Sequence, residues 1–177
     1  MISMALLHKK PEYMQKCCEL INTEWKRSDT ARMRSLENSC DSLPCNIILL
    51  QDKVLIGHLK LSSIPSIPEA CFVESVVILK SHRGMGYGTK IMNLAEEYCR
   101  DCLKLREIYL STKGQEQFYR KLGYVECPPV SIYGCPINTF RDLSPPPGTK
   151  IIAMEKKINN NMNVKQGLKI YMQKILC

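Results

Sequence analysis

The chain has few of the residues that mark special classes of protein. Aromatic residues make up 7% of its 177 residues, with a single Trp, and there are only 9 Gly and 10 Pro. So little Gly and Pro excludes a collagen-like or broadly disordered protein. No apolar run approaches the roughly 18 residues that suggest a membrane-spanning helix, and the first residues lack the pattern of a secretory signal. We therefore expect no membrane partner.

The ten cysteines lack the paired short spacings of a zinc site. Cys99 and Cys102 form one Cys-x-x-Cys pair, but it lies in a stretch of helical periodicity with no second pair nearby. We predict no metal site. Because nothing in the sequence indicates an oxidising compartment, we expect reduced thiols that act as small buried apolar side chains in a cytoplasmic protein.

The chain is basic, with 25 Lys and Arg against 17 Asp and Glu and a formal net charge of +8. Such a charge attracts nucleic acid, an anionic membrane, a phosphorylated cofactor or an acidic protein. The basic residues are scattered, and no basic stretch alternates with aromatic residues as in a nucleic-acid-binding platform. We expect no nucleic-acid partner.

The apolar periodicity predicts one α/β domain of the α+β type in which strands and helices alternate. Strands are expected at residues 4–7, 46–50, 54–61, 71–79, 107–112, 124–127 and 149–157, and helices at 11–25, within 26–38, after the glycines at 84–88, and at 115–122. A single domain is predicted over residues 1–158, and residues 159–177 are predicted to form a mobile tail. Three consecutive prolines, Pro145 to Pro147, favour a stiff connection over a polyproline II segment.

The most informative stretch runs from a β-prone strand through three alternating glycines into an amphipathic helix, at residues 76–89. Glycines let the backbone approach a ligand closely, and the N–H groups of a helix N-terminus favour an anion such as a diphosphate. The glycines run Gly-x-Gly-x-Gly, which fits neither a Walker A loop nor a dinucleotide fingerprint. The pattern that fits is Arg-x-x-Gly-x-Gly, with Arg83, Gly86 and Gly88.

This pattern, together with the downstream segment Phe118 to Tyr124, resembles the GCN5-related N-acetyltransferase (GNAT) superfamily. The resemblance implies a twisted mixed sheet, splayed between its fourth and fifth strands and flanked by helices, that holds acetyl-CoA in the gap. Many members carry an Asn after the fifth strand, so Gln115 or Thr112 would have to substitute for it. The residues implied for cofactor binding are Val76, Val77, Ile78, Arg83, Gly84, Met85, Gly86, Tyr87, Gly88, Thr89 and Gln115.

Acetyl transfer requires a neutral amine, stabilisation of an oxyanion, and a proton or hydrogen bond for the leaving thiolate. The family implies the strand backbone near Val77 for the oxyanion and Tyr119 for the thiolate, although a tyrosine here could also be part of the core. Glu74 and His58 are the candidate bases, directly or through water. A glutamate paired with a basic neighbour is an equally good account of Glu74.

The acceptor is expected near residues 25–36, which carry four basic residues, one acid and the single tryptophan. Such a surface prefers an acidic peptide, although a solvated basic helix with the tryptophan in the core is the alternative. The residues predicted to bind substrate are Trp25, Arg27, Arg32, Met33, Arg34 and Ser35.

Within the superfamily, this segment and the shortened loop before Phe118 and Tyr119 are similar to those of the actin N-terminal acetyltransferases. The matching residues of the segment are Trp25, Arg27, Ser28, Thr30, Arg32, Ser35 and Leu36. The resemblance implies acetylation of the acidic, processed N-terminus of actin, presented as a profilin–actin complex, by a monomeric enzyme. Two alternatives are an acetyltransferase for lysine or small amines and a non-catalytic module that binds acetyl-CoA. Comparing peptides with free and blocked N-termini would distinguish N-terminal acetylation from the first alternative. Cofactor binding without turnover of any peptide would indicate the second.

Overall fold

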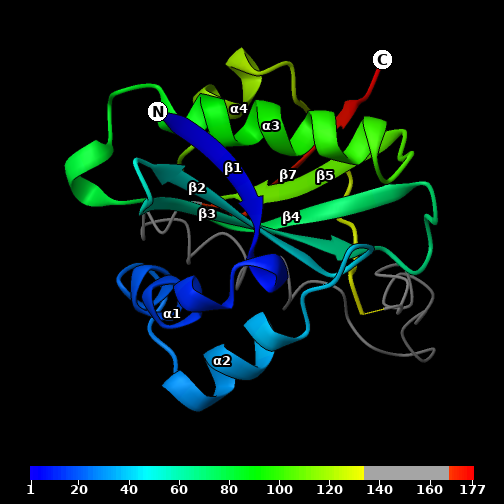
Figure 1. The fold of residues 1–177 in the computed structure, drawn as a ribbon. Helices are drawn as coiled ribbons and strands as arrows, with labels where there is room; N and C mark the ends of the chain where they lie inside the picture. Colours follow the sequence, from blue (N-terminus) through cyan, green and yellow to red (C-terminus); the bar gives the residue numbers. More distant parts are fainter. Residues whose placement is uncertain (134–167) are drawn as a thin grey trace, which may run out of the picture.

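The computed structural model describes residues 1–133 and 168–177 of the chain. A seven-stranded mixed sheet forms its centre, with the strand order β1-β2-β3-β4-β5-β7-β6 (Figure 1). The strands are β1 (Ile2–Leu6), β2 (Cys45–Gln51), β3 (Val54–Ser63), β4 (Ala70–Ile78), β5 (Glu107–Thr112), β6 (Val125–Cys127) and β7 (Ile170–Ile175). The helices are α1 (Met14–Asn22), α2 (Asp29–Glu37), α3 (Tyr87–Asp101) and α4 (Glu116–Lys121), with 3-10 turns η1 (Leu7–Lys9), η2 (Pro11–Tyr13) and η3 (Lys80–His82).

Helices cover both faces of the sheet, α3 and α4 on one side and α1 and α2 on the other (Figure 1). Strand β2 is buried along almost its whole length and belongs to both cores. Ile47 and Leu49 pack in the cluster that includes α3, whereas Ile48 and Leu50 pack in the cluster that includes α1 and α2. Because successive side chains of a strand point to opposite faces, an uninterrupted apolar strand fits a sheet covered on both sides.

The sheet opens between β4 and β5. Only residues Ala70 to Val73 of β4 pair with β5, in parallel, opposite Glu107 to Leu110. The rest of β4 keeps its antiparallel pairing with β3, as Ile78 opposite Gly57 shows. The predicted mixed sheet and its splay between the fourth and fifth strands are therefore confirmed.

A β-bulge lies in β4 where this strand leaves β5. On β3, His58 and Lys60 are two positions apart, whereas their partners on β4, Val77 and Glu74, are three apart. The inserted stretch includes Ser75, whose φ of 54° lies in the left-handed region. A bulge bends the strand and breaks its alternation, and residues 74–76 are accordingly all partly exposed, whereas both ends of the strand are buried.

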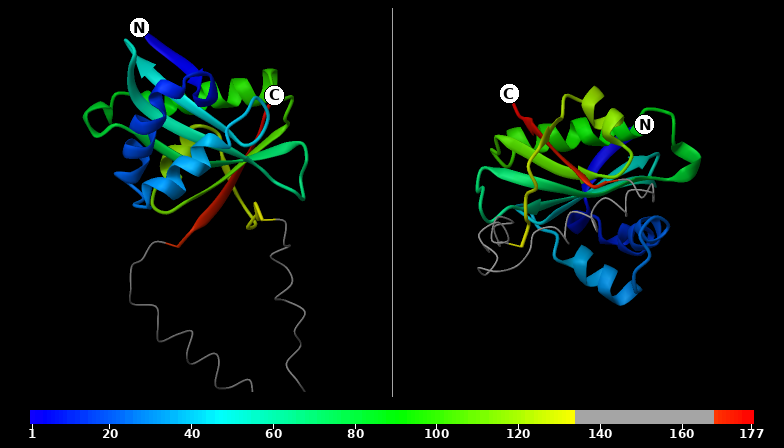
Figure 2. Two further views of the ribbon diagram at one scale, coloured as in Figure 1. Left: turned by 60° about the horizontal axis from the view of Figure 1, so that its bottom comes forward. Right: turned by 180° about the vertical axis from the view of Figure 1, so that it is seen from behind.

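The C-terminal residues form a strand of the sheet, so the prediction of a mobile tail over residues 159–177 is wrong for residues 170–175. β7 lies between β5 and β6 and pairs antiparallel with both (Figure 2). Met172 is fully buried, and the Lys174 ammonium pairs with Glu96 of α3 at 2.6 Å. The strand predicted at residues 149–157, the prolines at 145–147 and the domain boundary at 158 lie outside the described residues.

Candidate active site

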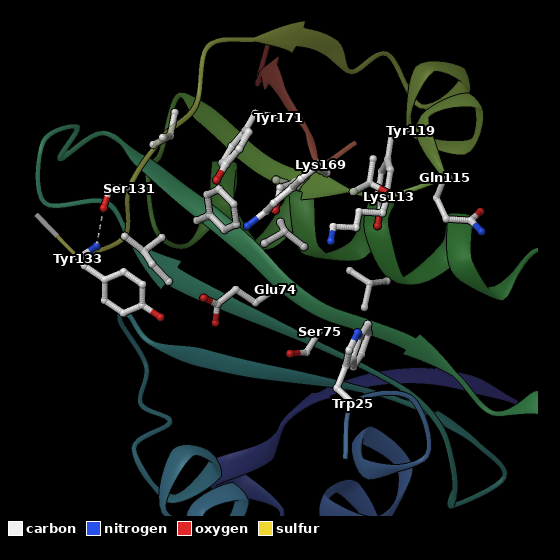
Figure 3. A pocket seen from close by; sticks show the side chains of 18 residues that line it. Trp25, Glu74, Ser75, Lys113, Gln115, Tyr119, Ser131, Tyr133, Lys169 and Tyr171 are labelled. Atoms are coloured by element: carbon white, nitrogen blue, oxygen red, sulfur yellow. Dashed lines mark hydrogen bonds between the residues drawn. The ribbon is translucent and has the colours of Figure 1, made fainter. Parts of the chain in front are cut away.

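The splay between β4 and β5 forms a cavity of about 720 Å³ (Figure 3). Its walls come from β4, β5 and the loop after it, α4, the loop after α1, residues 130–133, and the start of β7. The cavity brings together five of the predicted site residues from four different parts of the chain: Trp25, Glu74, Val76, Gln115 and Tyr119.

The turn before α3 has the geometry of an anion site. Gly84 and Gly86 have φ values of 76° and 82°, and a Cβ at either position would have no heavy atom within 4 Å. Helix α3 begins at Tyr87 with Gly86 as its N-cap, and no side chain caps it. The N–H groups of its first turn, reinforced by the helix dipole, fit the diphosphate of acetyl-CoA.

Gly88 has a packing role instead. A Cβ at this position would lie 3.3 Å from Cζ of Phe118, so the absence of a side chain lets α3 approach α4 closely. Met85 and Thr89 are exposed, while the Tyr87 hydroxyl donates to the Gln51 side chain at 3.2 Å. Cofactor contacts by these residues remain predictions.

Arg83 is bound within the protein. Its Nε donates to the carbonyl of Ile78 at 2.9 Å, and its guanidinium pairs with Glu24 at 2.5 Å. The hydrogen bond from Arg83 holds the pKa of Glu24 below its usual range. This pair ties the turn before α3 to the loop that carries Trp25, and a contact between Arg83 and the cofactor remains a prediction.

Tyr119 projects from α4 into the cavity (Figure 3). Its ring packs edge-on against Phe118 and Tyr124, with ring centres 5.0 and 5.8 Å away. Burial raises the pKa of the Tyr119 hydroxyl to about 12, so the hydroxyl keeps its proton at neutral pH. A protonated hydroxyl in this position can donate a hydrogen bond to a leaving thiolate.

Glu74 is paired with a basic neighbour, one of the two accounts that the sequence left open, and it also lies in the cavity wall. Its Oε2 pairs with Lys60 at 3.1 Å and accepts from the Ser62 hydroxyl at 3.3 Å. Because that oxygen is already engaged, Glu74 is better suited to orient an ammonium group or a water than to remove a proton from a strongly basic amine.

His58 does not fit the role of base. It is fully buried, and its Nδ1 and Nε2 lie 3.1 Å from the Ser75 carbonyl and 2.9 Å from Asn46 Oδ1, respectively. Burial lowers the pKa of His58 to about 4, so the ring is neutral at physiological pH. With both nitrogens occupied and no exposed surface, it cannot exchange a proton with an acceptor in the cavity.

The predicted acceptor segment is only partly in the cavity. Trp25 is 47% exposed and lines it, whereas Arg27, Met33, Arg34 and Ser35 do not. Arg32 also lies outside, and its guanidinium donates to the carbonyl of Trp25 at 2.6 Å and to Asn22 Oδ1 at 3.1 Å. Arg32 therefore fixes the backbone that presents Trp25, and none of the other basic residues of the segment lines the cavity.

Two lysines that the sequence did not single out line the cavity. Lys113 follows β5 and Lys169 precedes β7, and both side chains point toward its interior (Figure 3). Tyr171, on β7, completes the same wall. No local motif marks these residues, because β7 becomes a neighbour of β5 only through long-range pairing.

A helix N-terminus that can hold a diphosphate, a cavity in a splayed sheet and a partly buried tyrosine in its wall are the features expected of a protein that binds a coenzyme A thioester. Comparison with known families agrees. A model of the Acetyltransferase (GNAT) family matches residues 14–124, and the chain belongs to this family.

Among curated proteins, N-alpha-acetyltransferase 80 of Mus musculus is 36% identical over 122 residues, which are 65% of this chain and 38% of that protein. The chain thus spans well under half of that relative. Among solved structures, an aminoglycoside 6'-N-acetyltransferase with coenzyme A has a TM-score of 0.68 at 15% identity, covering 100% of this chain and 97% of the other. Spermidine N-acetyltransferase of Vibrio cholerae with CoA and spermine has a TM-score of 0.64 at 16% identity, covering 99% and 95%. These two structures support the fold.

Two features are absent from residues 1–133 and 168–177. Over these ranges, no helix combines the length and apolar character needed to cross a membrane. In the same part of the chain, no three His, Cys, Asp or Glu side chains are grouped so that they could hold a metal ion.

Proposed function

We propose that the protein transfers an acetyl group from acetyl-CoA to the α-amino group of polypeptides that begin with Asp or Glu, with the processed N-terminus of actin as its acceptor. The similarity to N-alpha-acetyltransferase 80 supports an N-terminal amine as the acceptor group. The observation that carries the acidic specificity is the pair of lysines, Lys113 and Lys169, in the cavity wall.

Both lysines are available to a ligand. They are exposed, and neither takes part in any ion pair formed among the described residues. The Lys169 ammonium lies 5.1 Å from the ring centre of Tyr171, which stabilises it at the cavity wall. Two ammonium groups in one cavity attract the carboxylates of an acidic peptide and repel a polyamine or a lysine side chain.

The candidate bases also favour an α-amino acceptor. Glu74 is already paired with Lys60, and His58 is buried and neutral. An α-amino group has a pKa of about 8 and is partly neutral at pH 7, whereas a lysine at about 10.4 is almost wholly protonated. A site with no free strong base among the described residues is therefore better matched to a polypeptide N-terminus.

The test is acetyl transfer to a panel of synthetic peptides with free N-termini. We expect turnover with Asp-Asp and Glu-Glu starts, and little with Ser or Met starts, with N-terminally blocked peptides that contain lysine, or with spermidine. Turnover of the blocked lysine peptides or of spermidine at comparable kcat/KM would contradict the proposal.

We further propose that the enzyme acts as a monomer in the cytosol on actin bound to profilin. Comparing kcat/KM for an actin N-terminal peptide, for actin and for profilin–actin tests the partner. Higher kcat/KM with profilin–actin than with actin alone supports it, and equal values contradict it. Elution of the active enzyme as a dimer on size-exclusion chromatography would contradict the monomeric state.

A further inference from the structure

A buried chain of polar side chains lies directly behind the bulge of β4. Asn46 on β2, His58 on β3 and the backbone carbonyl of Ser75 on β4 follow one another across three neighbouring strands, at 2.9 and 3.1 Å. Both side chains are fully buried. Burying polar side chains costs free energy that hydrogen bonds must offset, and apolar side chains would avoid this cost. We therefore ask what these two polar side chains do here.

The protons of this chain can be assigned. The Ser75 carbonyl can only accept, so His58 Nδ1 must carry the proton that bonds it. A neutral ring then leaves Nε2 as an acceptor, which requires a donor from Asn46. Turning the Asn46 amide by half a turn places its NH₂ against Nε2, and Asn46 Nδ2 is the end that otherwise has no partner. The alternative, a charged ring, would place a cation in a fully buried position near Arg32 and Lys60.

The Ser75 carbonyl determines where the next N–H points. The peptide between Ser75 and Val76 is planar and trans, so its C=O and N–H point in opposite directions. Because the Ser75 carbonyl is bonded to the His58 ring, the Val76 N–H is directed away from that ring. At this point β4 has separated from β5, which pairs only with Ala70 to Val73. Val76 lines the cavity there.

We propose that His58, supported by Asn46, is a positioning residue that fixes the Ser75–Val76 peptide so that the Val76 N–H donates to the oxyanion of acetyl transfer. In that reaction the amine nitrogen bonds to the thioester carbon as the carbonyl electron pair moves to oxygen. Collapse re-forms the carbonyl and expels the coenzyme A thiolate, while the amine loses its proton to water. The donor is needed for any amine acceptor, so the inference is independent of the proposed peptide specificity.

Ser75 shows why such a support is needed. A non-glycine residue with φ near 54° is held in an unfavourable region and persists only where the surroundings fix it. The hydrogen bond from His58 is the contact that fixes it here. Without that bond, the peptide can rotate and carry the N–H away from the cavity.

The kinetic test compares His58→Leu, which removes the donor, with His58→Gln, which keeps one, and with the matched control Ile48→Ala. Ile48 is fully buried and lies opposite His58 on β2, so its truncation costs stability without removing the hydrogen bond to Ser75. We expect kcat to fall about tenfold or more in His58→Leu, below the roughly 100-fold or larger cost of deleting an oxyanion donor outright.

We expect His58→Gln to recover most of the kcat of the unmodified enzyme. Ile48→Ala should retain that kcat even if its melting temperature falls as far as that of His58→Leu. The KM for acetyl-CoA should change little in all three, because the lost interaction forms only in the transition state. Unchanged kcat in His58→Leu, or an equal loss in Ile48→Ala, would overturn the inference.

Nitrogen NMR of the His58 ring gives a second readout that needs neither turnover nor a folded variant. We expect the neutral Nδ1–H tautomer in the unmodified enzyme. An Nε2–H tautomer would mean that Ser75 receives no hydrogen bond from the ring, and it would overturn the inference whatever the kinetics of the variants.

Discussion

At the scale of single residues, the shape of the predicted diphosphate site depends on Gly86. Its φ of 82° and the open space where a Cβ would lie leave the amides of α3 accessible. In Gly86→Leu the side chain fills that space, so we expect acetyl-CoA to bind about tenfold more weakly or worse, a loss of roughly 1.4 kcal/mol or more. Isothermal titration calorimetry with acetyl-CoA measures this directly.

The control for Gly86 must carry the same backbone strain. Gly123 has a φ of 89° but lies after α4, where a Cβ would meet only the Lys174 side chain at 3.5 Å or more. We expect Gly123→Leu to lower the melting temperature as Gly86→Leu does and to keep its affinity for acetyl-CoA. Equal losses of affinity in the two variants would mean that strain, and not filling of the anion site, is responsible.

His58 makes a prediction about stability as a function of pH. Burial is the main cause that lowers its pKa to about 4, and the positive charges of Arg32 and Lys60 add to it. Between this value and the ordinary pKa of about 6.5, the unfolded chain binds more protons than the folded one, so the free energy of unfolding falls as the pH falls. His58 should contribute a loss of roughly 2 kcal/mol between pH 7 and pH 4.5.

Urea unfolding at the two pH values measures this loss. The carboxylates of the protein also contribute, so the relevant quantity is the difference between the unmodified protein and His58→Leu. We expect the variant to lose less stability on acidification, by the amount assigned to His58. Parallel pH dependences in the two proteins would show that His58 titrates normally.

At the scale of elements, β7 depends on a partly buried ion pair. The Lys174 ammonium bonds Glu96 of α3 at 2.6 Å, and the two side chains are 25% and 10% exposed. Lys174→Met leaves the Glu96 carboxylate without its partner, which should lower the unfolding free energy by about 3 kcal/mol. This value is at the low end for buried pairs because Lys174 is partly exposed to solvent. Adding Glu96→Leu removes the unpaired charge and should recover much of the loss, as measured by chemical denaturation.

If the single and double variants were equally unstable, the loss would come from the contact of the Lys174 ammonium with the Tyr124 ring, 5.6 Å from its centre, and not from an unpaired charge. Because β7 also carries Tyr171 and follows Lys169, weakening of this strand should raise the KM for an acidic peptide. The KM for acetyl-CoA, which depends on the turn before α3, should change less.

The elements that were predictable from the sequence are those set by local patterns. Strand β5 was predicted at its observed residues, and the glycines before α3 indicated a turn because no other residue adopts a positive φ so readily. β7 was missed because its six residues alternate weakly and include Lys174, whose charge is compensated only by a distant glutamate. The bulge at Ser75 was missed for the same reason, since it depends on His58 and Asn46 of other strands.

At the scale of the whole molecule, the cavity shows where sequence reasoning reached its limit. A cluster of basic residues at 25–36 predicted the acceptor site, but only Trp25 of the substrate-binding residues predicted there lines the cavity. Arg32 instead holds the loop in place through its bond to the Trp25 carbonyl. The lysines that do face the cavity come from residues 113 and 169, far apart in the chain, and only the pairing of β5 with β7 brings them to one wall.

This arrangement predicts where an acidic acceptor is recognised. Replacing Lys113 and Lys169 together by Gln removes two cavity charges from a chain whose net charge is +8. Lys121→Gln, on the exposed surface of α4 and outside the cavity, makes a matched control with one charge removed. We expect the double variant to raise the KM for an Asp-Asp peptide about tenfold, since each charged contact contributes roughly 0.5–1 kcal/mol at a partly exposed site.

The dependence on ionic strength separates local recognition from general attraction by the positive charge of the molecule. The KM of the unmodified enzyme for the Asp-Asp peptide should rise with salt, because the lysines are exposed and screened. In the double variant this rise should be much smaller, whereas Lys121→Gln should keep it. If all three proteins showed the same salt dependence, the attraction would come from the overall charge, and the two lysines would not be the specificity element.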